Sequence, residues 1–183
     1  MNADMLPGMR RHAFARRLLL VAGAALLSTA VAAPPALAAP VRTFGSVIEA
    51  ESYDAQHGVR VFADPAASGG RAVAFSDGDW LRFDAVDFGA PGESSGFATW
   101  RSCATGSGTV ELRADSPDAT PFLTMSPAGG GCAAWYQSSL RLGLATTPTG
   151  VHTFYLRFRS DSRCEFYRFD SLQMIKQTGP PIP

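Results

Sequence analysis

The chain has 183 residues, 46% of them hydrophobic and 17% charged, and its 16 basic and 16 acidic side chains balance to no net charge at pH 7. Beyond residue 38 the sequence has a single lysine, Lys176, and no basic stripe, so it lacks the electrostatic footprint of a nucleic-acid-binding protein. Nothing after residue 38 has the length and apolar character of a transmembrane segment.

The N-terminus has the layout of a secretory signal peptide. An apolar run, Leu18–Leu27, is followed by small residues that end in Ala36-Leu37-Ala38. The positive charges ahead of the run are Arg10, Arg11, Arg16 and Arg17. The run is too short to span a bilayer comfortably, and Pro34 and Pro35 interrupt its continuation, which favours cleavage over retention as a membrane anchor. We therefore expect cleavage after Ala38 and secretion to the extracellular space, with the choice between Sec and twin-arginine export left open.

Removal of residues 1–38 leaves 145 residues with 12 basic and 15 acidic side chains, a net charge of −3. That length suits one domain with a hydrophobic core. We expect a lead-in over residues 39–45, a single module over residues 46–176 and a disordered, proline-rich tail over residues 177–183.

The module has almost no helical pattern and reads as short strands separated by turn residues, which is typical of an all-β sandwich or barrel. In Thr153–Arg159 every second residue from Phe154 is apolar, and in Trp80–Phe83 the tryptophan and Arg82 should face outward. The expected strands are Val47–Glu51, Val59–Phe62, Ala72–Phe75, Asp79–Phe88, Gly96–Ser102, Thr109–Arg113, Phe122–Met125, Tyr136–Leu142, Val151–Arg159 and Phe166–Ile175.

The opening strand carries two carboxylates two residues apart, Glu49 and Glu51. Side chains at positions i and i+2 of a strand share a face, about 6.5 to 7 Å apart at the backbone. Like charges held that close repel each other unless a cation neutralises them, and calcium prefers such oxygen ligands. The alternative is a surface carboxylate pair without a metal.

Three cysteines remain in the mature chain: Cys103, Cys132 and Cys164. In an oxidising compartment two of them should form a disulfide and one should be left over, and their spacings fit no zinc motif. The sequence does not fix the pairing. It weakly favours Cys103–Cys132, because both residues fall in loops beside strands that could be neighbours.

The opening Glu-Ala-Glu, the later Gly78-Asp79-Trp80 and the all-β pattern resemble a family 6 carbohydrate-binding module. The segments that carry the resemblance include IEAESYD at 48–54, SGGRAVAFSDGDWLRF at 68–83 and CAAWYQSS at 132–139. The resemblance implies a β-sandwich jelly roll of two antiparallel sheets with a structural calcium. It also implies that the module binds a polysaccharide or oligosaccharide without catalysing a reaction. The binding cleft would be formed by aromatic side chains on loops at the edge of the sandwich. We expect the chain to be a monomer.

The resemblance also implies which residues bind the metal. Glu49 and Glu51 would be joined by Asp170 from the last strand. A backbone carbonyl within residues 66–71 would complete the calcium site.

In the implied sugar cleft, Trp135 matches the family's tryptophan. The family's tyrosine falls on Phe75, or on Ala74 if no gap is allowed. Arg168 stands where the family has an asparagine, and we expect Arg168 and the neighbouring Tyr167 to contact the sugar. Because a guanidinium group suits carboxylates, Arg168 favours an acidic glycan over a neutral one.

Two of these assignments have alternatives. Arg168 could pair with Glu165 or Asp161 and play no part in ligand binding. Trp80 could form a second binding surface on the concave sheet, as in some members of the family, but a half-buried tryptophan that covers the sheet is the more common arrangement.

Two other classes of function stay open. A glycosidase acid–base pair formed by Glu49 and Glu51 is disfavoured, because carboxylates on one strand cannot flank a sugar ring from opposite sides. A small polysaccharide lyase using Arg168 and Tyr167 is the enzymatic alternative, although we expect no catalysis. A protein-binding or surface-attachment sandwich that has lost sugar binding is the third class, since fold alone does not fix function.

Overall fold

The structure, a computed structural model, describes residues 42–43, 45–91, 96–126, 131–143, 146–161 and 164–176. The expected signal peptide and tail lie outside these ranges. The described elements are β1 (Arg42–Thr43), β2 (Val47–Glu49), a 3-10 turn η1 (Ala50–Ser52), β3 (Ala55–His57), β4 (Arg60–Ala63), β5 (Arg71–Phe75), β6 (Trp80–Asp87), β7 (Gly96–Ala104), β8 (Thr109–Ala114), β9 (Leu123–Met125), β10 (Gly131–Leu142), β11 (Val151–Arg159) and β12 (Tyr167–Lys176). Within the described part of the chain, no helix has the length and apolar character needed to span a membrane.

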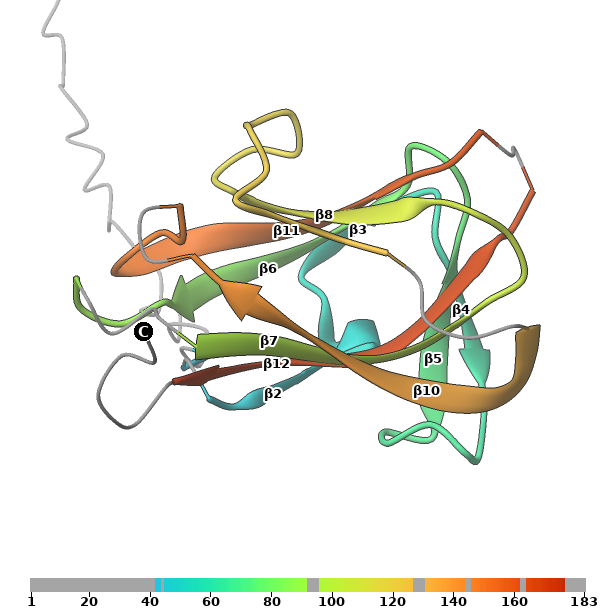
Figure 1. Cartoon of the computed structure of the whole chain (residues 1–183). Coiled ribbons are helices and arrows are strands. Elements are labelled where there is room, and N and C mark those ends of the chain that lie inside the picture. Colours follow the sequence, from blue (N-terminus) through green and yellow to red (C-terminus); the bar gives the residue numbers. More distant parts are fainter. Residues whose placement is uncertain are drawn as a thin grey trace, which may run out of the picture. The chain divides into compact units, whose positions relative to one another are not determined.

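Two stacked sheets form the module (Figure 1). Sheet A has the order β1-β6-β11-β8-β9, with β3 also paired to β6. Sheet B has the order β10-β7-β12-β5-β4, with β2 also paired to β12. Among the strands of the described ranges, every pair is antiparallel except β1 with β6. The predicted all-β jelly-roll sandwich is confirmed.

The core lies between the inner faces of the two sheets, where strand alternation places the apolar side chains. On β11, Phe154, Leu156 and Phe158 are almost fully buried, as the alternating pattern predicts. On β6 the residues on either side of Arg82 are fully buried while Arg82 stays partly exposed. Burying these large side chains is the main source of the module's stability.

The opening segment differs from its prediction. β2 ends at Glu49, and residues 50–52 form η1, because Ser52 Oγ donates a hydrogen bond to the Glu49 carbonyl at 2.7 Å and closes a tight turn. The predicted single strand Val47–Glu51, with Glu49 and Glu51 on one face, is therefore wrong. Arg42 and Thr43, placed by the sequence in the lead-in, pair with β6, so sheet A begins before residue 46.

Candidate functional site

A hollow of about 460 Å³ opens on the outer face of sheet B. Its walls come from β7, β10 and β12 and from the turn that joins β4 to β5. The lining residues are Asp64, Ala66, Arg101, Cys103, Cys132, Ala133, Ala134, Trp135 and Arg168. The structure therefore brings Trp135 and Arg168, two of the predicted sugar contacts, to one site.

Strand alternation decides which side chains reach this hollow. On β12, Tyr167 and Phe169 are fully buried in the core, so Arg168 between them points outward. Arg168 lies opposite Cys103 of β7 and opposite Ala74 of β5 in the strand register. Paired residues of antiparallel strands share a face, so Ala74 is the residue of β5 on the side of the hollow.

Trp135 is a half-buried aromatic platform at one end of the hollow. Its indole Nε1 donates a hydrogen bond to Asp64 Oδ2 at 3.2 Å. The guanidinium carbon of Arg101 lies 5.9 Å from the ring centroid, within cation–π range. These two contacts hold the ring in place from two directions.

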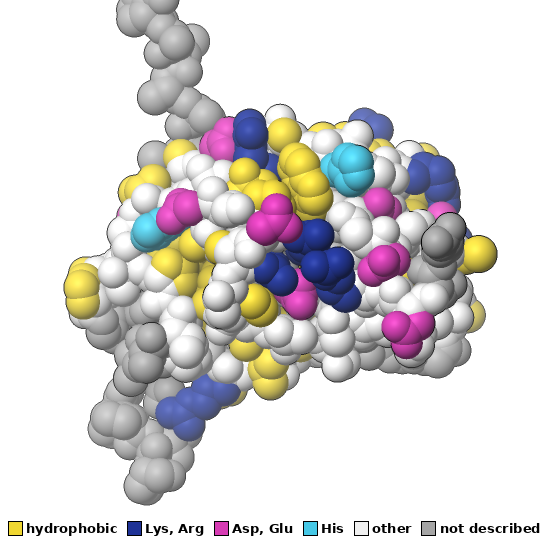
Figure 2. Space-filling view, turned by 90° about the horizontal axis from the view of Figure 1, so that it is seen from above, with side chains coloured by type: hydrophobic (Ala, Val, Ile, Leu, Met, Phe, Trp, Pro, Cys, Tyr) yellow, Lys and Arg dark blue, Asp and Glu magenta, His cyan; other side chains and the backbone are white. Residues whose placement is uncertain are grey.

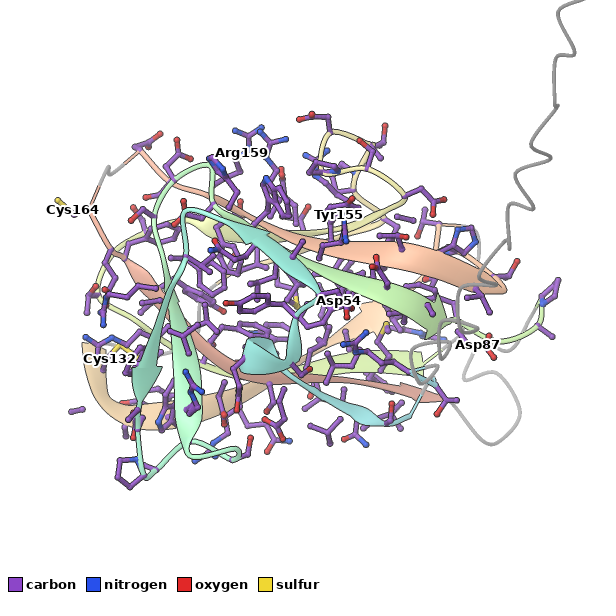
Figure 3. All side chains as sticks on the ribbon, turned by 180° about the vertical axis from the view of Figure 1, so that it is seen from behind. Asp54, Asp87, Cys132, Tyr155, Arg159 and Cys164 are labelled. Atoms are coloured by element: carbon purple, nitrogen blue, oxygen red, sulfur yellow. A yellow bond between two sulfur atoms is a disulfide. The ribbon has the colours of Figure 1, made fainter. Side chains whose placement is uncertain are left out.

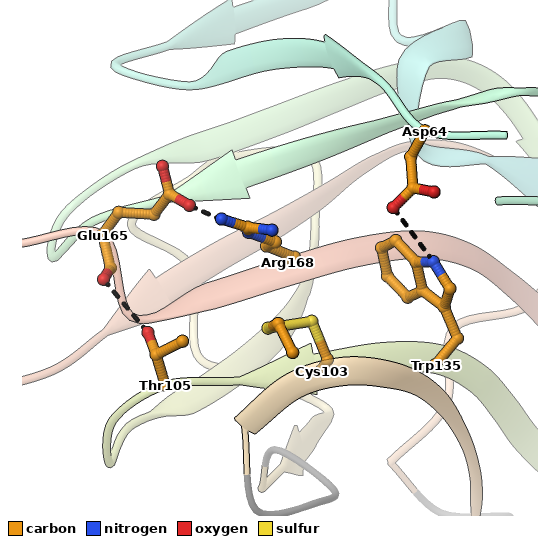
Figure 4. The surroundings of a disulfide bond; sticks show 7 residues. Asp64, Cys103, Thr105, Trp135, Glu165 and Arg168 are labelled. Carbon is orange, nitrogen blue, oxygen red and sulfur yellow. Dashed lines mark hydrogen bonds and ion pairs between the residues drawn. A yellow bond between two sulfur atoms is a disulfide. The ribbon is translucent and has the colours of Figure 1, made fainter. Parts of the chain in front are cut away.

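Arg168 forms the opposite side of the hollow (Figure 4). Its Nε donates to Glu165 Oε1 at 3.0 Å, and Glu165 is also paired with Arg60. The guanidinium carbons of Arg60 and Arg168 lie 5.1 and 5.0 Å from the ring centroid of Phe62. Although burial opposes it, the two guanidinium groups lower the pKa of Glu165, so the carboxylate stays charged. The pairing of Arg168 with Glu165, the alternative drawn from the sequence, is present, and Arg168 still lines the hollow.

Phe75 and Tyr167, both predicted as sugar contacts, do not line the hollow, and the structure contradicts their placement there. Each side chain has zero exposure and belongs to the core between the sheets. Phe75 points inward because the residue of β5 that faces outward beside Arg168 is Ala74. Burial strongly raises the pKa of the Tyr167 hydroxyl, so this group stays neutral inside the core. An alanine thus occupies the outward position where the family's tyrosine was expected.

The predicted disulfide between Cys103 and Cys132 is confirmed and lines the hollow. It joins β7 to the start of β10, where residues 132–135 continue a strand that the sequence placed in a loop. Figure 3 shows Cys132 and Cys164 toward the same end of the sandwich, with Asp87 toward the other. Cys164 is exposed and outside the disulfide.

Trp80 lies on the other sheet, away from the hollow. It starts β6 on the outer face of sheet A, where its ring stacks at 6.1 Å on His57 and meets the edge of Tyr155 at 5.7 Å. Gly78 ahead of it has a φ of +84°, which glycine adopts without strain, and the Asp79 carboxylate accepts the Ser76 N–H at 2.7 Å. The Gly-Asp-Trp motif therefore closes the β5–β6 turn and sets Trp80 at its end.

Arginines gather in the middle of this outer face of sheet A (Figure 2). Arg113 and Arg157 donate to the carbonyls of Ala119 and Pro117, so they tie the β8–β9 loop across the face. Arg113 also pairs with Glu111 at 2.6 Å. These guanidinium groups are engaged in holding the loop, and half-buried Trp80 helps to cover the sheet.

The predicted metal ligands Glu49, Glu51 and Asp170 come together where β2, η1 and β12 meet; we call them the carboxylate cluster. Pairing of β2 with β12 sets Glu49 opposite Ser171, the residue after Asp170. Ser68 Oγ lies 2.6 Å from Glu49 Oε2 and 2.9 Å from Asp170 Oδ1. Asp170 is fully buried, and its Oδ2 accepts Arg101 Nη1 at 3.0 Å.

The chemistry of the carboxylate cluster fits a cation, although in the described residues no three acidic, histidine or cysteine side chains close on one point that would hold a metal. Glu51 Oε2 is buried and has no hydrogen-bond partner among the described residues. A Cβ on Gly69 would lie 2.1 Å from Glu51 Oε1, so the turn passes close to this carboxylate and a side chain here would displace it. Burial, reinforced by the charges of Glu49 and Asp170, raises the pKa of Glu51. A hard cation would satisfy the orphaned oxygen and relieve this repulsion.

Three residues of the site were missed from the sequence: Phe62, Asp64 and Arg101. Asp64 and Arg101 fix the Trp135 ring, and Phe62 packs under Arg168. Asp64 and Trp135 are 71 positions apart, and no local spacing signals such a contact. Alternation along β7 predicts that Arg101 and Cys103 lie on one face of the strand. It does not predict that Arg101 contacts Trp135, which belongs to another strand.

The sequence matches the family model described as carbohydrate binding module (family 6) over residues 49–176. It is also similar to an arabinoxylan arabinofuranohydrolase of Bacillus subtilis (strain 168), with 29% identity over 136 residues, or 71% of this chain. The chain spans only 25% of that hydrolase.

Solved structures share the fold. A β-1,3-glucan-binding family 6 module from Bacillus halodurans has a TM-score of 0.65 at 22% identity, covering 74% of this chain and 99% of its own. A family 6 module from Clostridium cellulolyticum, solved with xylose, has a TM-score of 0.62 at 27% identity, covering 75% and 100%. The Bacillus subtilis glycoside hydrolase family 43 arabinoxylan arabinofuranohydrolase, solved with cellotetraose, has a TM-score of 0.66 at 24% identity, covering 76% of this chain and 28% of that one.

Proposed function

The chain belongs to the family 6 carbohydrate-binding modules, and from this membership we propose that it binds a polysaccharide or oligosaccharide, without catalysis, in the hollow between Trp135 and Arg168. The observation that carries the proposal is the fixed Trp135 ring at the edge of an open hollow with charged groups around it. A sugar ring has an apolar C–H face that can stack on an aromatic ring, and its hydroxyls need polar partners. Such a mixture of apolar surface and few polar groups is typical of small-ligand sites.

The polar partners are on both sides of the platform. Asp64 offers a carboxylate beside the indole, and Arg101 and Arg168 offer guanidinium donors. The disulfide joins the strands around the hollow, so less conformational entropy is lost when a ligand binds.

Neutral β-glucans and xylans are the first ligands to test, because related modules were solved with cellobiose, cellotriose and xylose. An acidic glycan is the second candidate, because Arg168 lines the hollow with a guanidinium group. Affinity electrophoresis in gels containing β-glucan, xylan, pectin or alginate tests both candidates. Retardation in at least one gel is expected, and migration unchanged in all four would contradict sugar binding.

A structural calcium ion at the carboxylate cluster is part of the proposal. Glu49, Glu51 and Asp170 would hold it, and the fit rests on the orphaned Glu51 oxygen and the glycine at position 69. Calcium would contribute charge neutralisation and a link between the first and last strands of sheet B.

The positions of Tyr167, Glu49 and Glu51 support a binding role over an enzymatic one. Tyr167 has zero exposure and cannot reach a substrate as a lyase base, and Glu49 and Glu51 gather with Asp170 instead of facing each other across a cleft. We also propose, from the signal-peptide pattern, that the protein acts outside the cell, and we expect it to act as a monomer.

A further inference from the structure

One turn of the chain, residues 64–70 between β4 and β5, contacts both the carboxylate cluster and the Trp135 platform. At its start Asp64 accepts the indole Nε1 of Trp135. Four residues later Ser68 contacts Asp170 through both its N–H and its hydroxyl, each at 2.9 Å. The turn is therefore a direct covalent path between the two sites.

Backbone hydrogen bonds make this turn a single unit. Asp64 N–H donates to the Gly70 carbonyl at 3.0 Å, and Ala67 N–H donates to the Asp64 carbonyl at 3.0 Å. The Asp64 side chain also accepts the Ala66 N–H at 2.9 Å. A displacement at Ser68 is consequently passed on to Asp64, because few dihedral angles between them are free to absorb it.

Arg101 forms a second link between the same two places. Its Nη1 donates to Asp170 at 3.0 Å, its Nη2 donates to the Ala66 carbonyl at 2.8 Å, and its guanidinium group lies over the Trp135 ring. The position of Asp170 therefore influences Trp135 through a side chain as well as through the turn.

Without a cation the cluster has too few donors. The Ser68 hydroxyl has one proton for two carboxylate oxygens, those of Glu49 and Asp170. Glu51 Oε2 has no donor in the part of the chain that the structure describes. A bound divalent cation would supply the missing positive charge. It would then hold Ser68 and Asp170 in one arrangement, and with them the turn and Arg101.

We propose that binding of a divalent cation such as calcium to the carboxylate cluster orders the Trp135 platform and thereby tightens glycan binding in the hollow. This inference rests on the proposed sugar-binding function. The coupling comes from preorganisation, since a platform that is already ordered loses less entropy when the glycan binds. Linkage requires the converse as well: the glycan raises the affinity for the cation by the same factor.

The first test needs no glycan. Calcium chloride is titrated into the chelator-treated protein while tryptophan fluorescence is recorded, and a Trp135→Phe variant identifies the contribution of that ring. We expect calcium to shift the Trp135 emission in the unaltered protein, and the shift to be lost in Asp64→Ala and reduced in Arg101→Gln. Arg141→Gln, at an exposed position of β10 outside the hollow, is the matched control and should respond like the unaltered protein.

The second test measures the affinity for cellotetraose by calorimetry with calcium and with chelator. At least about fivefold tighter binding with calcium is expected, the lower end of usual coupling strengths. Calcium that binds without moving the Trp135 emission, or that fails to bind at all, would overturn the coupling. If cellotetraose and the polysaccharide gels show no binding in either condition while the emission shift is present, the sugar-binding function fails and the link between cation and platform stands.

Discussion

Phe75 and Phe158 stack on each other in the core, one from each sheet, with their ring planes 19° apart. The contact joins β5 to β11 and explains why Phe75 is unavailable to a ligand. Both rings are fully buried, so replacing either one disrupts the packing of the core and lowers the stability of the fold.

Replacing Phe75 by alanine should destabilise the module by about 3 to 5 kcal/mol, the usual effect of removing a buried phenylalanine. Phe75→Leu keeps most of the volume and should have a much smaller effect. Urea unfolding followed by circular dichroism measures both. Glycan affinity at a temperature where the variant stays folded should match that of the unaltered protein, and a selective loss of affinity would restore Phe75 as a ligand contact.

Replacing Trp135 by alanine should weaken glycan binding by about 2 kcal/mol or more, roughly thirtyfold in affinity, as for a central aromatic contact. Trp80→Ala, on the outer face of the other sheet, is the matched control and should change the affinity little. Calorimetry with the polysaccharide retained most strongly in the gels measures both. The reverse order of effects would move the binding site to sheet A.

Removing the disulfide with Cys132→Ser should destabilise the module by about 2 to 4 kcal/mol, because the bond closes a loop with a sequence separation of 29 residues. Glycan affinity should fall with it, since residues 132–135 form part of the hollow. Cys164→Ser is the control: at this exposed position we expect a change within about 0.5 kcal/mol. Equal stability of the two variants under oxidising conditions would contradict the expected contribution of the bond.

Chelation should lower the melting temperature of the calcium-loaded protein. At a calcium concentration a hundred times the Kd, binding to the folded state alone contributes about 2.7 kcal/mol. Glu51→Gln removes the charge at the orphaned oxygen, so it should keep or raise the melting temperature without calcium and should lose most of the gain on adding it. Differential scanning fluorimetry with calcium, magnesium or chelator measures the melting temperature of both proteins. A melting temperature of the unaltered protein that does not change on adding calcium would argue against the site.

Stability should depend on pH through His152. Its Nδ1 lies 2.8 Å from Asp115 and its Nε2 lies 2.9 Å from the Thr149 carbonyl. The hydrogen bond to Asp115 raises the pKa of His152 above its unfolded value of about 6.5. The protonated ring therefore contributes its full stabilisation below about pH 6.5, and this is lost as the pH rises through the raised folded value.

The comparison is between the unaltered protein and His152→Gln, by urea unfolding at several pH values. We expect a difference of less than about 1 kcal/mol on the acidic side, since the pair is partly exposed. The difference should shrink on the alkaline side. A gap that widens as the pH rises would show that His152 acts through its neutral form.

The sequence by itself determined the class of fold and most of its strands. Alternation with a period of two on β6 and β11 follows directly from the geometry of an extended chain, so burial of Phe154, Leu156 and Phe158 could be read from the order of residues. The family and the meeting of Glu49 with Asp170 were accessible through the opening Glu-Ala-Glu and the Gly-Asp-Trp motif. The disulfide was favoured only weakly, because three cysteines allow more than one pairing.

The tertiary structure alone decided what surrounds these residues. From the sequence, the family's tyrosine could align with either Ala74 or Phe75, and neighbouring residues of a strand point to opposite faces. The pairing of Ala74 with Arg168 shows that Ala74 faces the hollow and that Phe75 points into the core. The ring of Trp135 depends on Asp64 and Arg101, which come from another turn and another strand. Such contacts form only when the strands and turns pack together and bring side chains that are far apart in the sequence next to each other. No local pattern in the sequence records them.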